Sequence, residues 1–337
     1  MVYRLEKINL SHGSGGLAMQ ELIKNIFLKK LYNPILSTLD DSAVIDLKIK
    51  RIAFTTDSFV VSPIFFKGAD IGKLAVCGTI NDLVVEGAIP RFISLGLILE
   101  EGLEFFILEK IIDSIAKTAK RENVYVVTGD LKVVEKGACD KIFINTSGLG
   151  ELIRDDLSIK KIKPTDKIII SGSIGEHGLS VLSGRKNQGI DFGIKSDCSS
   201  LAGLILPLIK KNKGIKFMRD PTRGGLAGTL NEISSAIKYS ILLEEEKIPI
   251  KDKVRSASEL LGIDPFYLAN EGKAVLVVDK KEAQSILKDL HKHPLGKDSA
   301  IIGEVIEEKR GKVLLKTITS GIRILEPPIE DLLPRIC

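Results

Sequence analysis

Short apolar segments of strand character and segments of helical periodicity follow one another in mixed order along the chain, with short connections. This order is typical of α+β domains, in which helices and strands form layers around a core. The pattern is interrupted between Glu151 and Thr165, where charged residues and Pro164 follow an apolar run ending at Gly150. Since 337 residues suggest about two domains of roughly 150 residues each, we predict an α+β fold of two mixed α/β domains.

The predicted parts are a glycine-rich arm and helix over residues 1–38, a first domain over 39–152, a second over 153–325 and a mobile tail over 326–337. In the first part of the chain we predict strands at 42–47, 51–55, 92–99, 124–128 and 141–147, and helices at 17–30, 70–86 and 105–119. In the second domain we predict strands at 167–171, 216–218, 240–243, 273–278 and 301–305, and helices at 201–211, 225–237 and 281–291.

The composition argues against several classes of function. The 49 Lys and Arg residues are interleaved with 44 Asp and Glu, without a basic run, which argues against nucleic-acid binding. The first residues lack the apolar core of a signal peptide, and no segment reaches the roughly 20 apolar residues that span a membrane. Four scattered cysteines without a C-x-x-C pair fit a reducing compartment. We therefore expect a cytoplasmic protein without a cysteine zinc site or a histidine metal cluster.

A cysteine, Cys337, is the last residue and follows a segment interrupted by Pro327, Pro328 and Pro334. Prolines resist helical docking, and a final residue is not packed from both sides. From Pro328 onward the segment would span about 30 Å if extended, at about 3.3 Å per residue. Cys337 is therefore predicted to be a reactive thiol that can reach a site on this chain or on a neighbouring subunit. The alternative is a frayed end without function.

Aspartates stand beside apolar strand-like runs at Asp41, Asp57 and Asp130, and Asp82 lies on a helix that is apolar nearly all round. Strand ends that face one crevice are where α/β sheets gather ligand groups. A buried carboxylate is costly unless it is paired or bound to a metal, and several of them facing one space repel each other. Because Mg²⁺ prefers a few carboxylates together with phosphate oxygens and water, the pattern favours a site for a nucleotide bound with magnesium. Taken alone, Asp41, Asp57 and Asp130 are more typical of turn or cap residues, whereas Asp82 is less readily explained in this way.

Two glycine-containing segments are weaker signals. Residues 13–16, which include Gly15 and Gly16, match neither a Walker A loop nor a dinucleotide fingerprint. Their amides can cover phosphates, or the segment can be a mobile arm. Residues 220–225, Asp-Pro-Thr-Arg-Gly-Gly, open a predicted helix and form either an anion site or a tight turn. Lys132 and Glu271 lie beside predicted turns, and each taken alone is typical of a charged surface residue.

Together these segments resemble the ATP-binding superfamily of aminoimidazole ribonucleotide synthetase, which includes selenophosphate synthetase and thiamine-monophosphate kinase. The final residues, Pro334 to Cys337, resemble the ending of one branch, the HypE family of hydrogenase maturation factors, and the likeness covers essentially the whole chain. The motifs that carry the superfamily resemblance are residues 13–16, 40–42, 55–58, 81–83, 129–130 and 220–225.

The resemblance implies an ATP-dependent carbamoyl dehydratase. Cys337 would receive a carbamoyl group from the carbamoyltransferase HypF, and the thiocarboxamide would be dehydrated to a thiocyanate. The cyano group would pass to iron on a HypC–HypD complex during maturation of [NiFe]-hydrogenase. The family forms homodimers through the sheet of its N-terminal domain.

The resemblance also assigns roles to residues. Lys132 and Glu271 would handle the protons of the carboxamide beside Cys337. Asp41, Asp57, Asp82 and Asp130 would hold magnesium and ATP, and the remaining nucleotide-binding residues would be Gly15, Gly16, Thr56 and Gly129.

Two alternatives remain open at this stage. A selenophosphate-synthetase-like kinase would carry a reactive Cys or selenocysteine in its glycine-rich loop, whereas residues 11–20 contain no Cys. A non-enzymatic carrier would use ATP only to gate docking, and Cys337 would transport a group made elsewhere. Stoichiometric ATP consumption that depends on Cys337 separates the carrier from the enzyme.

Overall fold

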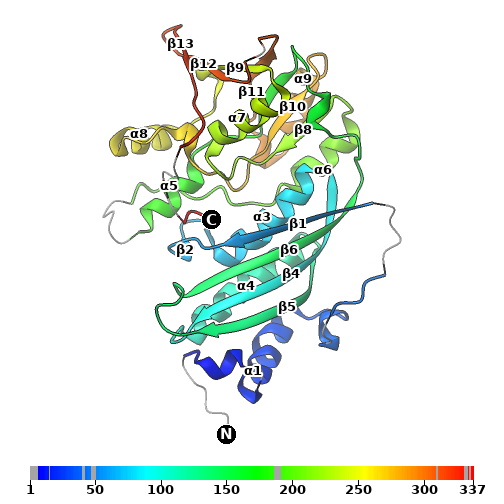
Figure 1. The fold of residues 1–337 in the computed structure, drawn as a ribbon, viewed down its shortest axis with the longest axis vertical. Helices are drawn as coiled ribbons and strands as arrows, with labels where there is room; N and C mark the ends of the chain where they lie inside the picture. The colour runs from blue at the N-terminus through cyan, green and yellow to red at the C-terminus, as the bar shows by residue number, and fades with distance from the viewer. Residues whose placement is uncertain are drawn as a thin grey trace.

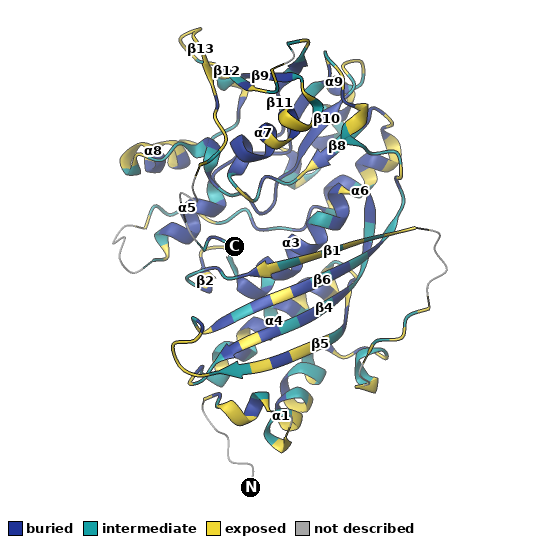
Figure 2. Cartoon of the chain, in the orientation of Figure 1, coloured by how far each residue is buried: buried dark blue, intermediate teal, exposed yellow. Residues whose placement is uncertain are grey.

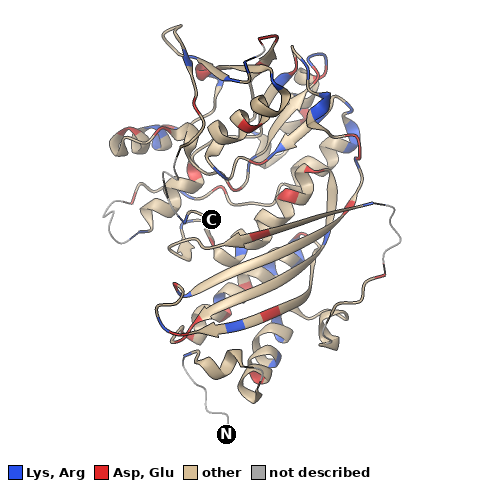
Figure 3. Cartoon of the chain, viewed as in Figure 1, with Lys and Arg blue, Asp and Glu red and all other residues tan. Residues whose placement is uncertain are grey.

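The computed structural model describes residues 7–14, 16–39, 42–46, 51–185, 191–308, 310–329, 333 and 335–337. Each half of the chain is built around its own sheet, and the carboxyl terminus lies where the two halves meet (Figure 1). Figure 3 shows Lys and Arg interspersed with Asp and Glu over both halves. None of the helices in the described ranges combines the length and apolar character needed to cross a membrane.

The N-terminal sheet has the strand order β1-β6-β4-β5, in which β4 and β5 are parallel and the other pairs antiparallel. Helices α3 and α4 cover one face of this sheet (Figure 1). Side chains on the other face, which we call the open face, include Phe54, Ile98 and Tyr125, exposed to 69%, 43% and 49%. Exposed residues are interspersed along the strands of this sheet (Figure 2). The elements are β1 (Ile52–Phe59), α3 (Ile71–Val85), β4 (Ala88–Glu100), α4 (Phe105–Arg121), β5 (Tyr125–Val134) and β6 (Ile142–Leu152), with a small ribbon of β2 (Phe65–Phe66) and β3 (Ala69–Asp70).

Helix α3 confirms the predicted helix over 70–86. The Asp70 carboxylate accepts the backbone N–H groups of Gly72 and Lys73 at 2.8 and 3.0 Å, which satisfies two of the unpaired donors at the helix start. The helix is buried along nearly its whole length because it lies between the sheet, α4 and helix α6 (Ala202–Lys211) of the second domain. Its apolar composition all round therefore reflects contacts on all sides.

The C-terminal sheet has the order β13-β12-β9-β11-β7-β10-β8, and its strands are mostly antiparallel. Its strands are β7 (Lys167–Ile170), β8 (Ile215–Arg219), β9 (Ser240–Glu244), β10 (Val275–Val278), β11 (Ala300–Ile306), β12 (Val313–Lys316) and β13 (Ile322–Ile324). Its helices are α5 (Glu176–Ser183), α6 (Ala202–Lys211), α7 (Gly225–Ile237), α8 (Asp252–Leu261) and α9 (Ala283–Leu290). Short single turns complete this domain: η4 (Ile159–Lys161), η5 (Glu245–Lys247), η6 (Pro265–Tyr267) and η7 (Pro294–Gly296).

The N-terminal arm packs beside strand β5. The turn η1 (Leu10–Gly13) places Gly13 so close to Val133 that an added Cβ would lie 2.3 Å from the Val133 nitrogen, so only glycine fits there. The following helical run confirms the helix predicted over 17–30 and is divided into α1 (Leu17–Leu22), η2 (Ile23–Leu28) and α2 (Lys29–Leu31). A further turn, η3 (Leu36–Thr38), ends the arm.

One strand prediction was wrong. Residues 42–46 of the predicted strand 42–47 have no strand pairing, and Leu47 lies outside the described residues. Val44 is 81% exposed, because this short apolar alternation has no neighbouring strand to pack against. The sequence prediction also missed α5, α8, β12 and β13.

Candidate active site

The candidate site lies where α3 of the first domain meets loops of the second. Asn81 on α3 is buried, at 1% exposed. Its amide nitrogen donates to the carbonyl oxygens of Ser199 and Glu271 at 3.1 and 3.3 Å, and its amide oxygen accepts the Leu201 N–H at 2.8 Å. One side chain thus fixes two loops of the second domain against the helix that carries Asp82.

Asp57 and Asp82 form the acidic side of the site. Asp57 is on the helix-covered face of β1. Its carboxylate lies close to Gly78 of α3, since a Cβ atom added to that glycine would be 3.7 Å from the carboxylate oxygen. Asp82 accepts a hydrogen bond from the Thr55 hydroxyl at 2.7 Å. Burial raises the pKa of both carboxyls above the ordinary value, and the neighbouring charge of Asp57 raises the pKa of Asp82 further. The two carboxylates therefore share a poorly solvated space.

The loop before α7 brings a third carboxylate and a cation to this space. Burial and the charge of Asp82 raise the pKa of Asp220 to about 7. The Arg223 guanidinium lies 3.2 Å from the Asp57 carboxylate and links the two domains by an ion pair. Gly224 and Gly225, both at positive φ, let the chain turn into α7 at this point. The sequence motif at 220–225 is therefore a tight turn whose charged side chains face Asp57 and Asp82.

Glu271 is the most deeply buried acid of the site, at 2% exposed. Its Oε1 atom has no hydrogen-bond partner, although its backbone N–H donates to Asp197 at 3.2 Å. Burial, followed by the charges of Asp220 and Asp197, raises the pKa of Glu271 well above its ordinary value. An unpaired buried carboxyl is costly, and a carboxyl of raised pKa is suited to proton transfer near neutral pH.

The last residues of the chain lie against the same region. The Val60 N–H donates to the Cys337 carbonyl at 2.9 Å, and the Ser62 N–H donates to the Arg335 carbonyl at 3.1 Å. Ile336 is buried in the core that both domains share. The mobility predicted for the tail stays a prediction, and in this structure its end is docked on its own chain.

A hollow of about 490 Å³ separates the docked tail from the turn that carries Arg223. Its lining includes Cys337 and Arg335 of the tail together with Thr222, Arg223 and Tyr267. The thiol-bearing residue therefore borders a space large enough for a small group, next to the ion pair of Arg223 with Asp57.

Asp130 and Lys132 lie elsewhere. Both are exposed on the open face of β5, paired with Gly96 and Ile98 of β4, and their side chains form an ion pair of 2.9 Å that lowers the pKa of Asp130. Asp57 lies on the opposite face and at the other end of the strand order. The expectation that Asp130 joins Asp57 and Asp82 in one cluster is therefore wrong within a single chain, and Lys132 is likewise separated from Glu271.

The remaining residues predicted to bind the nucleotide also lie in different parts of the structure. Thr56 points to the open face, where its hydroxyl donates to the Thr146 carbonyl at 2.9 Å. Gly129 packs directly on the Leu95 carbonyl, and Gly16 begins α1 in open space beside β5. Asp41 and Gly15 lie outside the described residues.

The described residues contain no group of three or more His, Cys, Asp or Glu side chains arranged to hold a metal ion. The donors that do converge, Asp57, Asp82 and Asp220, are hard oxygen ligands whose mutual repulsion a cation would relieve. Mg²⁺ takes few protein carboxylates and completes its shell with phosphate and water. These residues therefore fit a magnesium ion that arrives with a nucleotide, and they do not fit a closed metal cage.

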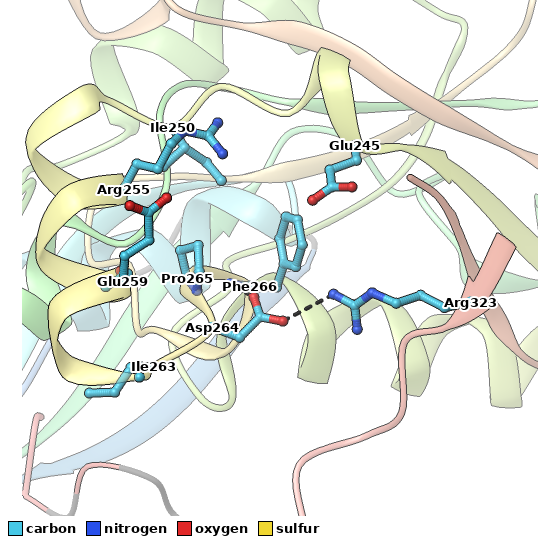
Figure 4. A pocket seen from close by; sticks show the side chains of 11 residues that line it. Glu245, Ile250, Arg255, Glu259, Ile263, Asp264, Pro265, Phe266 and Arg323 are labelled. Atoms are coloured by element: carbon cyan, nitrogen blue, oxygen red, sulfur yellow. Dashed lines mark hydrogen bonds and ion pairs between the residues drawn. The ribbon is translucent and has the colours of Figure 1, made fainter. Parts of the chain in front are cut away.

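A second hollow, of about 270 Å³, lies on the C-terminal domain between α8 and β13 (Figure 4). Phe266 and Pro265 line it, and its rim carries the ion pair of Arg323 with Asp264 at 3.1 Å. None of the sequence-predicted site residues borders it.

Two residues at the site were missed by the sequence analysis. His177 contacts the tail through a hydrogen bond to Ile336, and Arg335 donates to the Val60 carbonyl and pairs with Asp140 at 3.0 Å. Arg335 was quoted only as part of the C-terminal tetrapeptide. The signal for His177 was its place between Gly175 and Gly178, where a bulky ring enters a crowded turn.

Comparison with known proteins gave the following matches. The family described as AIR synthase related protein, N-terminal domain, matches residues 39–152, and the C-terminal domain of the same description matches residues 163–316. Carbamoyl dehydratase HypE of Escherichia coli (strain K12) is 44% identical over 339 residues, which cover 99% of this chain and 100% of the relative.

Solved structures match to a similar extent. The crystal structure of hydrogenase maturation protein HypE in complex with ATP has a TM-score of 0.93 at 45% identity, covering 97% of this chain and 99% of that one. The HypE–HypF complex has a TM-score of 0.79 at 46% identity, with 91% and 99% covered.

Proposed function

The chain belongs to the AIR synthase related family and, within it, to the HypE hydrogenase maturation proteins, and from this membership we propose that it is an ATP-dependent carbamoyl dehydratase. It dehydrates a thiocarboxamide on Cys337 to a thiocyanate, the donor of the cyanide ligand of iron in [NiFe]-hydrogenase. The observation that carries the proposal is the position of Cys337, which borders the hollow between the tail and Arg223 beside the buried carboxylates.

The chemistry requires a better leaving group than the amide oxygen. ATP transfers its γ-phosphoryl group to the carbonyl oxygen of the thiocarboxamide, forming a C–O–P bond and releasing ADP. Loss of the two nitrogen protons and of phosphate then leaves a carbon–nitrogen triple bond on sulfur. The sulfur carries the group throughout and is not itself consumed.

This chain's own residues supply the proton acceptor and the positioning. Glu271 has a raised pKa and an unpaired oxygen, so that it can hold one of the nitrogen protons. Tethering the carboxamide to the docked tail raises its effective concentration at the site. Asp57, Asp82 and Asp220 would hold magnesium, which supplies neutralisation of the charge on the transferred phosphoryl group.

We also propose that the working protein is a homodimer in which each site takes residues from both chains. Asp130 and Lys132 are separated from Asp57 and Glu271 by the sheet of one chain, and they lie on its open face. Exposed Phe54, Ile98 and Tyr125 on that face are typical of a surface that is covered in an assembly. A second copy on the open face would bring its β5 edge, with Lys132, to the first chain's site.

HypF is proposed as the carbamoyl donor because the HypE–HypF complex is a solved relative of this chain. A HypC–HypD complex that carries iron is the proposed acceptor of the cyano group. Family membership supports both proposed partnerships and the proposed place in the cytoplasm.

The test is mass spectrometry of the C-terminal peptide. The protein is incubated with HypF and carbamoyl phosphate, and then with Mg-ATP. We expect a carbamoyl group on Cys337, followed by loss of one water that requires ATP. Carbamoylation without any ATP-dependent loss of water would favour the carrier, which binds ATP but does not consume it.

A further inference from the structure

His177 is a buried histidine that has no part in the proposed chemistry. It lies in the first turn of α5, is 0% exposed, and its ring stands edge-on against Phe66 with the centroids 5.4 Å apart. Its Nε2 atom lies 2.9 Å from the carbonyl oxygen of Ile336, and its Nδ1 atom lies 2.8 Å from the Ser196 hydroxyl.

The hydrogen bonds define which ring nitrogen carries the proton. A carbonyl oxygen only accepts, so Nε2 must donate to Ile336. The Ser196 hydroxyl already accepts the Cys198 N–H at 3.0 Å, so its own proton points to Nδ1. Burial lowers the pKa of His177, which favours this neutral form. His177 is thus fixed as a neutral donor aimed at the last peptide group of the chain.

The last residues are held from two sides. The carbonyls of Arg335 and Cys337 face one way and accept the N–H groups of Ser62 and Val60. The carbonyl of Ile336, which lies between them in the chain, instead accepts the hydrogen bond from His177. Backbone holds one side of the tail, and a single side chain holds the other.

The segment that orients His177 also reaches the candidate base. Asp197 follows Ser196 and accepts the Glu271 backbone N–H at 3.2 Å, while its carboxylate forms a buried ion pair of 3.0 Å with Lys273. Ser196 itself is anchored by its N–H to the Lys67 carbonyl at 2.8 Å. Ser196 and Asp197 therefore connect the contact on the tail to the loop that carries Glu271.

We propose that His177 is a positioning residue that holds the peptide group of Ile336 and thereby fixes Cys337 at the edge of the site. The Nε2–H donor of His177 is present in the neutral imidazole, and its hydrogen bond to Ile336 forms without a bound ligand. The docking of the tail is independent of any activity, whereas its consequence for turnover rests on the proposed function.

The test measures alkylation of Cys337 by iodoacetamide in the full-length protein, followed by peptide mass spectrometry. His177→Phe keeps an aromatic ring against Phe66 but cannot donate, and we expect Cys337 to react about fivefold faster, the effect of one lost buried hydrogen bond. In His177→Gln the side-chain amide can donate to the same carbonyl, so the rate should return toward that of the wild type.

The chain provides its own control for folding. Cys77, Cys139 and Cys198 are buried and should stay unlabelled while the protein is folded. If His177→Phe exposes these three, Ser196→Ala replaces it as the test, since it keeps the ring but removes the group that orients it, and we expect a smaller acceleration in the same direction. A wild-type rate in the folded variant, or equal acceleration in His177→Phe and His177→Gln, would overturn the proposal.

The same preparations separate this proposal from the proposed function. Faster alkylation in His177→Phe, with no ATP-dependent dehydration in the wild type, would retain the role of His177 and reject the dehydratase. Dehydration in the wild type, with an unchanged alkylation rate in His177→Phe, would retain the dehydratase and reject the role of His177.

Discussion

Asp57 and Asp130 occupy opposite faces of the N-terminal sheet, on the two strands at opposite ends of its order. Three strand spacings of about 4.8 Å place them roughly 14 Å apart across the sheet, with the sheet itself between their side chains. No carboxylate spans that separation. A site that needs both residues must therefore draw them from two chains.

This separation predicts complementation between inactive variants. Lys132→Ala and Glu271→Gln damage the two separate groups, so a heterodimer of the two variants contains one intact site. Equal mixing by co-expression should restore about a quarter of wild-type dehydration, since half the dimers are mixed and each has one working site. Mass spectrometry of Cys337 measures the product.

A matched pair tests whether the restoration is specific. Glu271→Gln and Cys337→Ser both damage the part of the site that a single chain supplies, so no dimer in this mixture contains an intact site and the mixture should stay inactive. Restoration in neither mixture, with both variants dimeric, would mean that each site is built from one chain.

The open face predicts where the dimer can be broken. Phe54 is 69% exposed on β1, and Phe54→Asp places a charge where a second copy would bury it. We expect a monomer by size-exclusion chromatography with light scattering. Phe106, 50% exposed on α4, is the control, because Phe106→Asp puts the same charge on the helix side. If the Phe54→Asp variant remained a dimer, the open face would not be the dimer interface.

Asp220 should make stability depend on pH. Its folded pKa of about 7 lies above the ordinary 3.8, so the protonated carboxyl favours the folded state. The contribution is complete below about pH 4 and is lost as the pH rises through 7. Asp220→Asn should therefore raise the melting temperature by a few degrees at pH 8, roughly the effect of 1 kcal/mol, and leave it unchanged near pH 4, measured without nucleotide or metal.

Asp156 supplies the control of opposite sign. Arg154 lowers the pKa of Asp156 to about 2, so that this carboxylate stabilises the folded state above pH 4 and loses its contribution as the pH falls through 2. Asp156→Asn should thus lower the melting temperature at pH 8. Equal shifts in both variants at pH 8 would contradict the assigned environments.

The sequence predicted most helices and strands, but it did not predict the face to which each strand residue points. Strand β1 reads Ile-Ala-Phe-Thr-Thr-Asp-Ser-Phe, with apolar residues on both faces, so its alternation does not distinguish the helix-covered face from the open face. The register with β6 makes that assignment, and it separates Thr56 from Asp57. Of the four aspartates predicted to form one site, Asp57 and Asp82 therefore come together and Asp130 does not, while Asp41 lies outside the described residues.

Contacts distant in sequence were also beyond prediction. His177 meets Ile336 across 159 residues, and no local pattern indicates such a partner. Helix α8 was missed because its exposed face is strongly polar and only Val254, Ala257 and Ser258 are buried. By contrast, α3 was predicted closely because Asp70 caps it and its apolar run is unbroken.

Glu271 should show a trade between activity and stability. Its carboxyl is buried with an unpaired oxygen, and the nearby charges of Asp220 and Asp197 disfavour ionisation. Glu271→Gln removes the ionisable carboxyl of Glu271 while keeping the shape of the side chain. We therefore expect a higher melting temperature at pH 8. Dehydration should be slowed at least about 100-fold, as for loss of a general base. Carbamoylation of Cys337 by HypF should continue, because it does not use this carboxyl. Normal dehydration in a stabilised Glu271→Gln would remove Glu271 from proton transfer and leave it as a buried structural acid.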